Sequence, residues 1–255
     1  PKYESNMFKH ETQVIKFLLQ WYSVNARNLP WRKKNTLNLP DPYFVFVSEY
    51  MLQQTTVNTV KNKFNDFILK WPSLNKLAQT SEPNILKFWS GLGYYSRARN
   101  LLKSAKIIKN NFKNKIPETY DELIQLPGIG DYTAKAILGI GYNKSVMPLD
   151  ANIERILVRL HAIDKPINKV KNKLKDLGKK FISDKYSSNL IQSFMDYGSE
   201  ICLPRNPKCN ICGINKFCQS YKKNLQQKIP FKQKKKSNKP CLLYTSPSPR
   251  DKRQS

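Results

Sequence analysis

Residues 126–138 read LPGIGDYTAKAIL, and this stretch decides the fold that we expect. It joins a helix predicted at about 119–126 to another predicted at about 131–142. Gly128 and Gly130 permit positive φ angles and the close approach of a second backbone. The amides that follow them point outward at a helix N-terminus, where an anion is favoured. We interpret the stretch as a helix–hairpin–helix that binds DNA phosphates without reading base sequence. The alternative is an ordinary joint between two packed helices.

Apolar residues recur at helical spacing on both sides of this hairpin. Alternating strand patterns are scarce, so the sequence predicts an all-α protein. Further helices are expected at residues 11–24, 42–71 (in two pieces), 81–90, 96–112, 150–162, 168–182 and 186–201.

The charge balance indicates a polyanionic partner. The 255 residues include 45 Lys and Arg against 18 Asp and Glu, a net charge of +27. Residues 221–255 carry +10 of this, which leaves +17 on residues 1–220. Nucleic acid is the first candidate, and a merely solvated lysine-rich surface is the alternative. No apolar stretch is long enough for a membrane helix, and the polar opening PKYESNMFKHE is no signal peptide. We therefore expect a cytoplasmic protein without membrane contact.

Four of the five cysteines form a tight cluster with the spacing C-x6-C-x2-C-x5-C: Cys202, Cys209, Cys212 and Cys218. A disulfide framework is not expected, because a core of this size needs no staples. A zinc knuckle more often uses two C-x-x-C pairs or adds histidine, and both histidines, His10 and His161, lie far away in the sequence. Ligation by thiolates alone favours a [4Fe–4S] cluster over zinc and over unligated thiols.

The composition changes after Cys218. Residues 221–240 are rich in lysine and are predicted to be a basic linker. Residues 241–255, CLLYTSPSPRDKRQS, continue neither this linker nor a plausible new domain, so we expect a non-native tail. Cys241 lies in this tail and is not expected to be a ligand.

Several blocks in order resemble the endonuclease III superfamily of base-excision DNA glycosylases, and within it the adenine DNA glycosylases of MutY type. Besides LPGIG and the cysteine cluster they are LPWR (29–32), SEYMLQQT (48–55), GLGYYSRAR (91–99) and LDAN (149–152). The resemblance covers about residues 10–220. It implies two helical subdomains with the active site in the cleft between them. One would be a bundle with the hairpin, and the other would pair the N-terminal helix with a [4Fe–4S] loop at 202–218.

The resemblance also assigns catalytic roles. Glu49 lies on an otherwise apolar helix, where burial raises a carboxyl pKa and suits a general acid; the alternative is a capping or ion-paired glutamate. Asp150 would stabilise positive charge on the sugar, although on local spacing alone it is a good helix N-cap. Asn152 would support it. Tyr132 stands where endonuclease III-like relatives carry a lysine nucleophile, which implies a glycosylase without strand cleavage.

Other positions are implied to recognise the substrate. Residues that wedge into the duplex beside a flipped nucleotide and around 8-oxoguanine would be Gln54, Leu92 and Tyr94, with core packing as the alternative for Leu92. Residues of the adenine pocket would be Arg27, Trp31 and Gln192. Arg97 and Arg99 are expected to face phosphate or solvent.

The expected partner is double-stranded DNA with adenine opposite 8-oxoguanine or G, bound by a monomeric bacterial protein. The chain ends before the family's C-terminal 8-oxoguanine-recognition domain, so weaker discrimination between these two mispairs is expected. Two alternatives remain. One is an endonuclease III-like glycosylase/lyase for oxidised pyrimidines, and the other is a non-catalytic iron–sulfur module that binds DNA.

Overall fold

The computed structural model describes residues 2–231, and of residues 2–9 it describes only the backbone. Within this range the chain forms no β-strand, and one isolated β-bridge joins Lys34 to Pro40. The all-α prediction is confirmed. The α-helices are α1 (Lys2–Asn25), α2 (Pro42–Leu52), α3 (Val57–Lys70), α4 (Leu74–Ala78), α5 (Glu82–Trp89), α6 (Ser96–Asn111), α7 (Tyr120–Ile124), α8 (Asp131–Ala136), α9 (Ala151–Leu160), α10 (Lys171–Lys179), α11 (Ser187–Glu200) and α12 (Gln219–Lys222).

The C-terminal predictions fall largely outside this range. The basic linker expected at 221–240 is described only up to Phe231, and the tail expected at 241–255 lies wholly outside the described residues. Among residues 2–231, no helix combines the length and the apolar character needed to cross a membrane.

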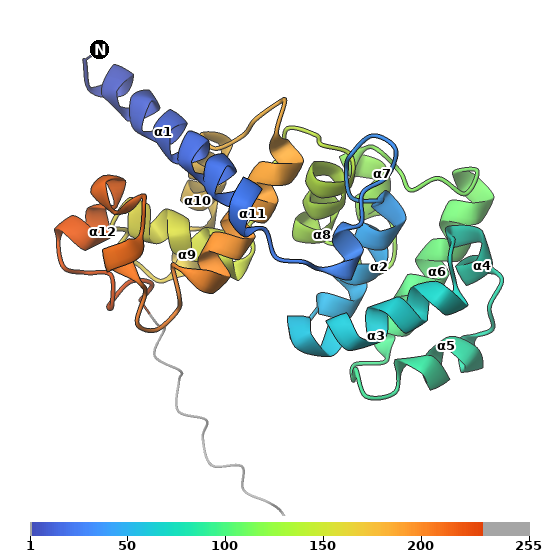
Figure 1. Ribbon diagram of the computed structural model, residues 1–255. Coiled ribbons are helices and arrows are strands. Elements are labelled where there is room, and N and C mark those ends of the chain that lie inside the picture. The colour runs from blue at the N-terminus through green and yellow to red at the C-terminus, as the bar shows by residue number, and fades with distance from the viewer. Residues whose placement is uncertain (1, 232–255) are drawn as a thin grey trace, which may run out of the picture.

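The helices gather into two groups (Figure 1). The first consists of α1, α9, α10, α11 and α12, and the second of α2 to α8. In the first group, α1 packs along α11, and α11 packs on α9. In the second group, α4 and α5 both pack against α6. The segment that follows α1 crosses from one group to the other.

Side chains just outside the helices explain where several of them begin. Asp41 accepts a hydrogen bond from the Tyr43 amide (2.8 Å) at the start of α2. Thr56 caps α3 and Thr119 caps α7 in the same way. Each such cap satisfies a backbone donor that has no partner within the helix. The starts of these helices therefore rest on local chemistry.

The two groups of helices are in close contact at Gly139. One helix was expected over 131–142, but α8 ends at Ala136 and a π-helical turn follows over Ile137–Gly141. A Cβ on Gly139 would lie 2.2 Å from Ile191 Cδ1 on α11, so any larger residue would require the end of the Ile191 side chain to move. In addition, Ser188 of α11 donates a hydrogen bond to the Ile140 carbonyl (2.8 Å). These contacts hold the end of the hairpin against the first group.

Other helices differ from expectation in extent. Helix α1 begins at Lys2, whereas the sequence predicted a start near residue 11. Helix α4 was not predicted, because five residues are too few to show a helical period. Ser73 caps it, and its Leu77 is fully buried. Burial of one short apolar face therefore defines this helix.

Candidate active site

Glu49 is a buried carboxyl group on α2. Most side chains of this helix are buried and apolar, and Glu49 itself is only 6% exposed. Burial raises the pKa of Glu49 to about 8, and the negative charge of Asp150 acts in the same direction. A hydrogen bond from Tyr132 lowers it in part. Glu49 therefore holds a proton at neutral pH.

Asp150 both caps a helix and lines the site. One carboxylate oxygen accepts a hydrogen bond from the Ile153 amide (2.7 Å), which begins α9. The other accepts one from Asn152 Nδ2 (2.8 Å). Burial raises the pKa of Asp150 above its ordinary value, and these hydrogen bonds partly oppose the rise. The two interpretations made from the sequence, cap and functional carboxylate, are thus compatible in one residue.

Tyr132 lies on α8 and connects to Glu49. Its hydroxyl donates a hydrogen bond to the Glu49 carboxyl group. Burial and the nearby charge of Glu49 raise the pKa of Tyr132 above its ordinary value. It therefore remains a neutral phenol that can orient Glu49 but offers no amine as a nucleophile.

One cavity of about 510 Å³ collects these groups. Its walls come from α2, α8, α9, α11 and the segment after α1. Of the residues expected from the sequence, it brings together Glu49, Tyr132, Asp150, Asn152, Arg27, Trp31 and Gln192. The carboxyl groups of Glu49 and Asp150 thus line one cavity, which is large enough for a small ligand.

A fully buried carboxylate, which was not predicted from the sequence, binds two arginines of this cavity. Asp196 on α11 is 0% exposed and binds Arg27 Nε (2.6 Å) and Arg32 Nη1 (2.7 Å). Burial alone would raise the pKa of Asp196, but the hydrogen bonds and charges of the two arginines keep it below its ordinary value. The available signal was a single acid within an otherwise uncharged helical segment, residues 187–199.

The other expected recognition residues lie outside the cavity, on three loops beside it. The three loops carry Gln54, Leu92 with Tyr94, and Gly128 with Gly130. Their connections are hydrogen bonds from Gln53 Nε2 to the Gly128 carbonyl (3.1 Å) and from Thr55 Oγ1 to the Leu92 carbonyl (3.5 Å).

The side chains on these loops differ in exposure. Tyr94 is 63% exposed, whereas Leu92 is buried and packs in the core, as the alternative expectation had it. Gln54 and Tyr94 both have positive φ angles, 56° and 46°. Such backbone conformations are uncommon outside glycine and gather at functional loops.

Arg97 corrects an expectation. It was expected to face phosphate or solvent, but it is buried and binds backbone carbonyls. Its guanidinium donates to Met51 (2.7 Å) and to Leu92 (2.8 Å), among others. Arg97 therefore ties the end of α2 to the loop at 91–94. Arg99 is half exposed and pairs with Glu82 (2.8 Å), so it does lie at the surface.

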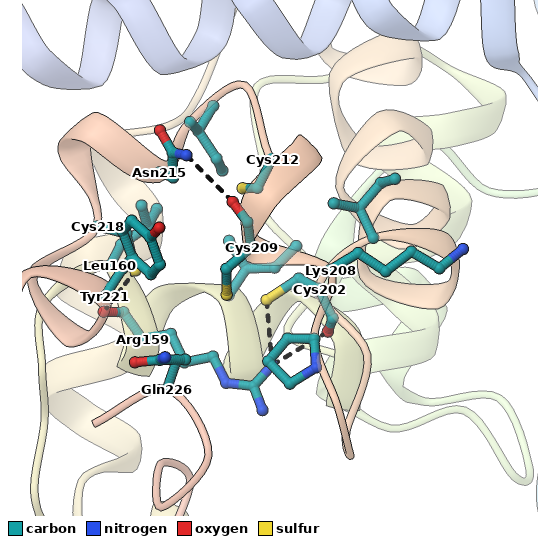
Figure 2. Close-up of a pocket in the computed structure, with 14 residues that line it drawn as sticks. Arg159, Leu160, Cys202, Lys208, Cys209, Cys212, Asn215, Cys218, Tyr221 and Gln226 are labelled. Atoms are coloured by element: carbon teal, nitrogen blue, oxygen red, sulfur yellow. Dashed lines mark hydrogen bonds between the residues drawn. The ribbon is translucent and has the colours of Figure 1, made fainter. Parts of the chain in front are cut away.

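The four clustered cysteines, Cys202, Cys209, Cys212 and Cys218, line a single cavity beside α9 (Figure 2). All four are free thiols. Arg159 of α9 donates a hydrogen bond to Cys202 Sγ (3.3 Å), and the hydroxyl of Tyr197 donates one to Cys212 Sγ (3.2 Å). Donors aimed at sulfur stabilise a thiolate, the form that binds metals.

The donor set fits a cluster better than one ion. Among the described residues, no three His, Cys, Asp or Glu side chains are placed to hold a single metal ion. A structural zinc site needs four donors that converge on one point. In a cubane cluster each thiolate binds its own iron, so four thiols spread around one cavity are suitable.

The fold and the site together define an all-α, helix–hairpin–helix protein with two carboxyl groups in one cavity, buried Glu49 and half-buried Asp150. The profile of the family described as "HhH-GPD superfamily base excision DNA repair protein" matches residues 47–180, which include Glu49, the hairpin and Asp150. The chain belongs to this superfamily.

Individual relatives agree with the family. The adenine DNA glycosylase of Buchnera aphidicola subsp. Schizaphis graminum (strain Sg) is 43% identical over 222 residues, 86% of this chain and 62% of that protein. The adenine DNA glycosylase of Buchnera aphidicola subsp. Baizongia pistaciae (strain Bp) is 43% identical over 230 residues, 89% of this chain and 64% of that protein. The chain therefore spans less than two thirds of these curated relatives. The structure of a thermostable thymine-DNA glycosylase is similar with a TM-score of 0.75 at 26% identity, over 84% of this chain and 98% of that one.

Proposed function

We propose that this protein is a DNA glycosylase that hydrolyses the N-glycosidic bond of adenine in duplex DNA. The observation that carries the proposal is the pair of carboxyl groups in one cavity, with Glu49 buried and protonated at neutral pH and Asp150 half-buried and hydrogen-bonded to Asn152. Two carboxyl groups with different protonation states are the usual machinery for cleaving a glycosidic bond. We choose adenine as the excised base because this chain is similar to adenine DNA glycosylases.

The proposed reaction begins with the adenine flipped out of the duplex into the cavity. Glu49 donates its proton to N7 of the base, the C1′–N9 bond breaks, and its electron pair leaves with the base. The Asp150 carboxylate stabilises the positive charge on the sugar. Water then adds to C1′ and loses its proton to a carboxylate, which leaves an abasic site and free adenine. Tyr132 keeps the Glu49 carboxyl group oriented throughout.

The proposed substrate is adenine opposite 8-oxoguanine or G, bound by one copy of the chain. The three loops with Gln54, Tyr94 and Gly128 lie beside the mouth of the cavity, where they could contact the duplex around the flipped nucleotide. Since Tyr132 has no amine, the strand should not be cut in the same reaction.

We also propose a [4Fe–4S] cluster on Cys202, Cys209, Cys212 and Cys218. When bound, the cluster would cross-link the loop and supply a one-electron redox centre. Arg159 and Tyr197 would hold the thiolates through their hydrogen bonds. Iron and acid-labile sulfide analysis of protein purified without oxygen tests this, with about four of each per chain expected. Zinc at one equivalent would overturn it.

Single-turnover assays test the activity. Three duplexes are compared, with adenine opposite 8-oxoguanine, adenine opposite G, and thymine glycol, each analysed with and without alkali. Adenine loss with strand breaks only after alkali supports the proposal. Cleavage of the thymine glycol strand without alkali would favour the endonuclease III-like alternative. Absence of cleavage by cluster-loaded protein that still binds the duplexes would favour the non-catalytic module.

A further inference from the structure

A second cavity lies beside the candidate active site and is lined by cations. Its volume is about 670 Å³, and its walls come from α1, α3, α11 and the segment after α1, which crosses between the two helix groups (Figure 1). Four of its lining side chains are positively charged: Arg27, Arg32, Lys33 and Lys34. Among the described residues that line it, none is acidic. A cleft lined by one sign of charge attracts the opposite charge, so this cavity favours an anion.

This positive lining is not common to the large cavities of the chain. The catalytic cavity contains the carboxyl groups of Glu49 and Asp150. A third cavity, of about 570 Å³ at the start of α2, is lined in part by Asp41 and Glu118. The second cavity therefore differs in charge from both, although the surface of the whole molecule is rich in lysine.

Arg27 keeps two hydrogen-bond donors available. Its Nε donates to one oxygen of the buried Asp196 (2.6 Å) and its backbone amide to the other (3.0 Å). Within the described part of the chain, its Nη1 and Nη2 have no hydrogen-bond partner, yet they are not among the enclosed polar atoms, and the side chain is 24% exposed. Asp196 thus offsets one charge of the lining and leaves the outer edge of this guanidinium free. Such an edge binds phosphate oxygens in pairs.

The backbone of Lys33 and Lys34 is held in place beside this arginine. The Lys33 carbonyl accepts a hydrogen bond from the Asp41 amide (3.2 Å), and Lys34 forms the isolated β-bridge with Pro40. Both lysine side chains are exposed, and neither forms an ion pair among the described side chains. Neighbouring like charges repel one another, and a bound anion would offset that cost.

The size and the remaining lining suit more than a single phosphate. A volume of about 670 Å³ lies within the range of sites for small organic ligands. Three exposed amides complete the polar lining: Asn28, Asn65 and Asn189. A carboxamide both donates and accepts hydrogen bonds, as the edge of a base and the hydroxyls of a sugar require.

We propose that the second cavity binds a nucleoside monophosphate. Arg27, Lys33 and Lys34 hold the phosphate, which carries about −1.5 to −2 charge at pH 7, and the asparagines contact the nucleoside. Of residues 52–57, 91–94 and 126–130, which form the three loops proposed to contact DNA, none lines this cavity. The ligand is therefore a free nucleotide and not the duplex held by those loops. Because Arg27 and Arg32 also line the catalytic cavity, the nucleotide binds beside side chains that the two cavities share.

Equilibrium dialysis of radiolabelled deoxyadenosine monophosphate against the full chain tests the phosphate contacts. Lys33→Gln/Lys34→Gln removes two charges that line only the second cavity. The matched control is Lys76→Gln/Lys87→Gln, because these two lysines are also exposed and line neither cavity.

A steric variant tests the location independently of charge. Asn65→Trp on α3 fills the second cavity from an exposed position that does not line the catalytic one. Asn62→Trp is its control, since Asn62 is exposed on the same helix and lines neither cavity.

We expect one nucleotide to bind per wild-type chain with a Kd below about 1 mM. Binding should weaken at least about tenfold in the double lysine variant and in Asn65→Trp, and should stay within about twofold of wild type in both controls. Deoxyadenosine and inorganic phosphate should each bind at least about fivefold more weakly than the nucleotide. Absence of binding, equal losses in the controls, or equal affinity for either fragment would overturn the proposal.

The same dialysis with a saturating, fully paired duplex distinguishes the two sources of phosphate. A free-nucleotide site outside the DNA-contacting loops should keep its affinity within about threefold when the duplex is bound. Displacement of one nucleotide for each duplex bound would show that the cavity belongs to the DNA surface, and would overturn the nucleotide site.

Discussion

At the scale of single residues, the environment of Glu49 decides its chemistry. A glutamate in water is ionised at neutral pH, whereas burial on α2 and the neighbouring Asp150 raise the pKa of Glu49 to about 8. The protonation of Glu49 is thus set by its surroundings and not by its residue type.

Glu49→Gln tests the acid directly. The amide keeps the shape of the side chain but has no acidic proton, so we expect duplex binding to be retained and excision to fall by about 10²-fold or more. Gel-shift titration and single-turnover kinetics measure the two effects. Glu118→Gln, a surface change in another ion pair, should leave both unaltered. Wild-type turnover in Glu49→Gln would remove Glu49 from the mechanism.

The pH dependence follows from the same pKa. Excision should fall as pH rises through about 8, because Glu49 then loses its proton. It should also fall on the acid side as Asp150, whose pKa is raised by burial, becomes protonated. A bell-shaped profile of single-turnover rates is therefore expected. A rate that still increases above pH 9 would contradict it.

Stability supplies an independent check of this pKa. Above the ordinary value of 4.5 the unfolded chain loses the Glu49 proton, while the folded chain retains it up to about pH 8. Wild-type stability should therefore decline relative to Glu49→Gln across that window and level off above it. Urea unfolding of both proteins at a series of pH values measures the difference.

At the scale of elements, the hairpin depends on one of its two glycines more than on the other. Gly128 has a φ of +82°, and a Cβ there would lie 3.0 Å from Tyr50 and from Asn100. Gly130 has a φ of −105° and open space around it. A substitution at Gly128 would strain the backbone, whereas one at Gly130 would not. The two positions therefore serve as test and control.

We expect Gly128→Ala to lower the free energy of unfolding by about 1–2 kcal/mol and to weaken duplex binding. Gly130→Ala should cost less than about half as much, since alanine adopts its backbone conformation without strain. Urea denaturation and fluorescence anisotropy on one duplex measure the two effects. Equal losses in both variants would show that backbone strain is not what sets the hairpin.

Arg97 connects the end of α2 to the loop at 91–94 through hydrogen bonds to backbone carbonyls. Replacing it with leucine leaves the carbonyls of Met51 and Leu92 without their donor in a buried place. We expect Arg97→Leu to lower the free energy of unfolding by about 3 kcal/mol. Arg99→Leu, two residues on, breaks only a half-exposed pair with Glu82 and should cost at most about 1 kcal/mol. Similar urea midpoints for the two variants would contradict the structural role of Arg97.

At the scale of the whole molecule, charge sets how the protein approaches its partner. The net charge of +27 is spread over both the helical part and the C-terminal segment. Such an excess attracts the phosphates of any duplex, whatever its sequence.

Duplex affinity should therefore fall steeply with salt, with a log–log slope of roughly −4 to −5 if about five phosphates are neutralised. Anisotropy titrations over a series of salt concentrations measure this slope. A fully paired duplex without a mispair is the control and should give a similar slope at lower affinity. A slope near zero would show that the excess charge is only a solvated surface.

Several features of this protein could be predicted from local sequence. Helix positions followed from apolar spacing and, at Asp150, from a local capping residue, because both act within a few residues of the chain. The hairpin and the cysteine spacing are likewise contiguous stretches. The short helix α4 and the π-helical turn at 137–141 were not predicted, because burial against distant side chains defines them.

The sequence by itself determined the helical class, the hairpin, the net charge and the thiol-rich loop, because these depend on neighbouring residues and on composition. Only the tertiary structure decided that Glu49 and Asp150 face one cavity, that Asp196 anchors two arginines there, and that Arg97 is buried. A pKa or an ion pair depends on desolvation and on charges brought from remote segments. That information exists only once the two groups of helices have packed together.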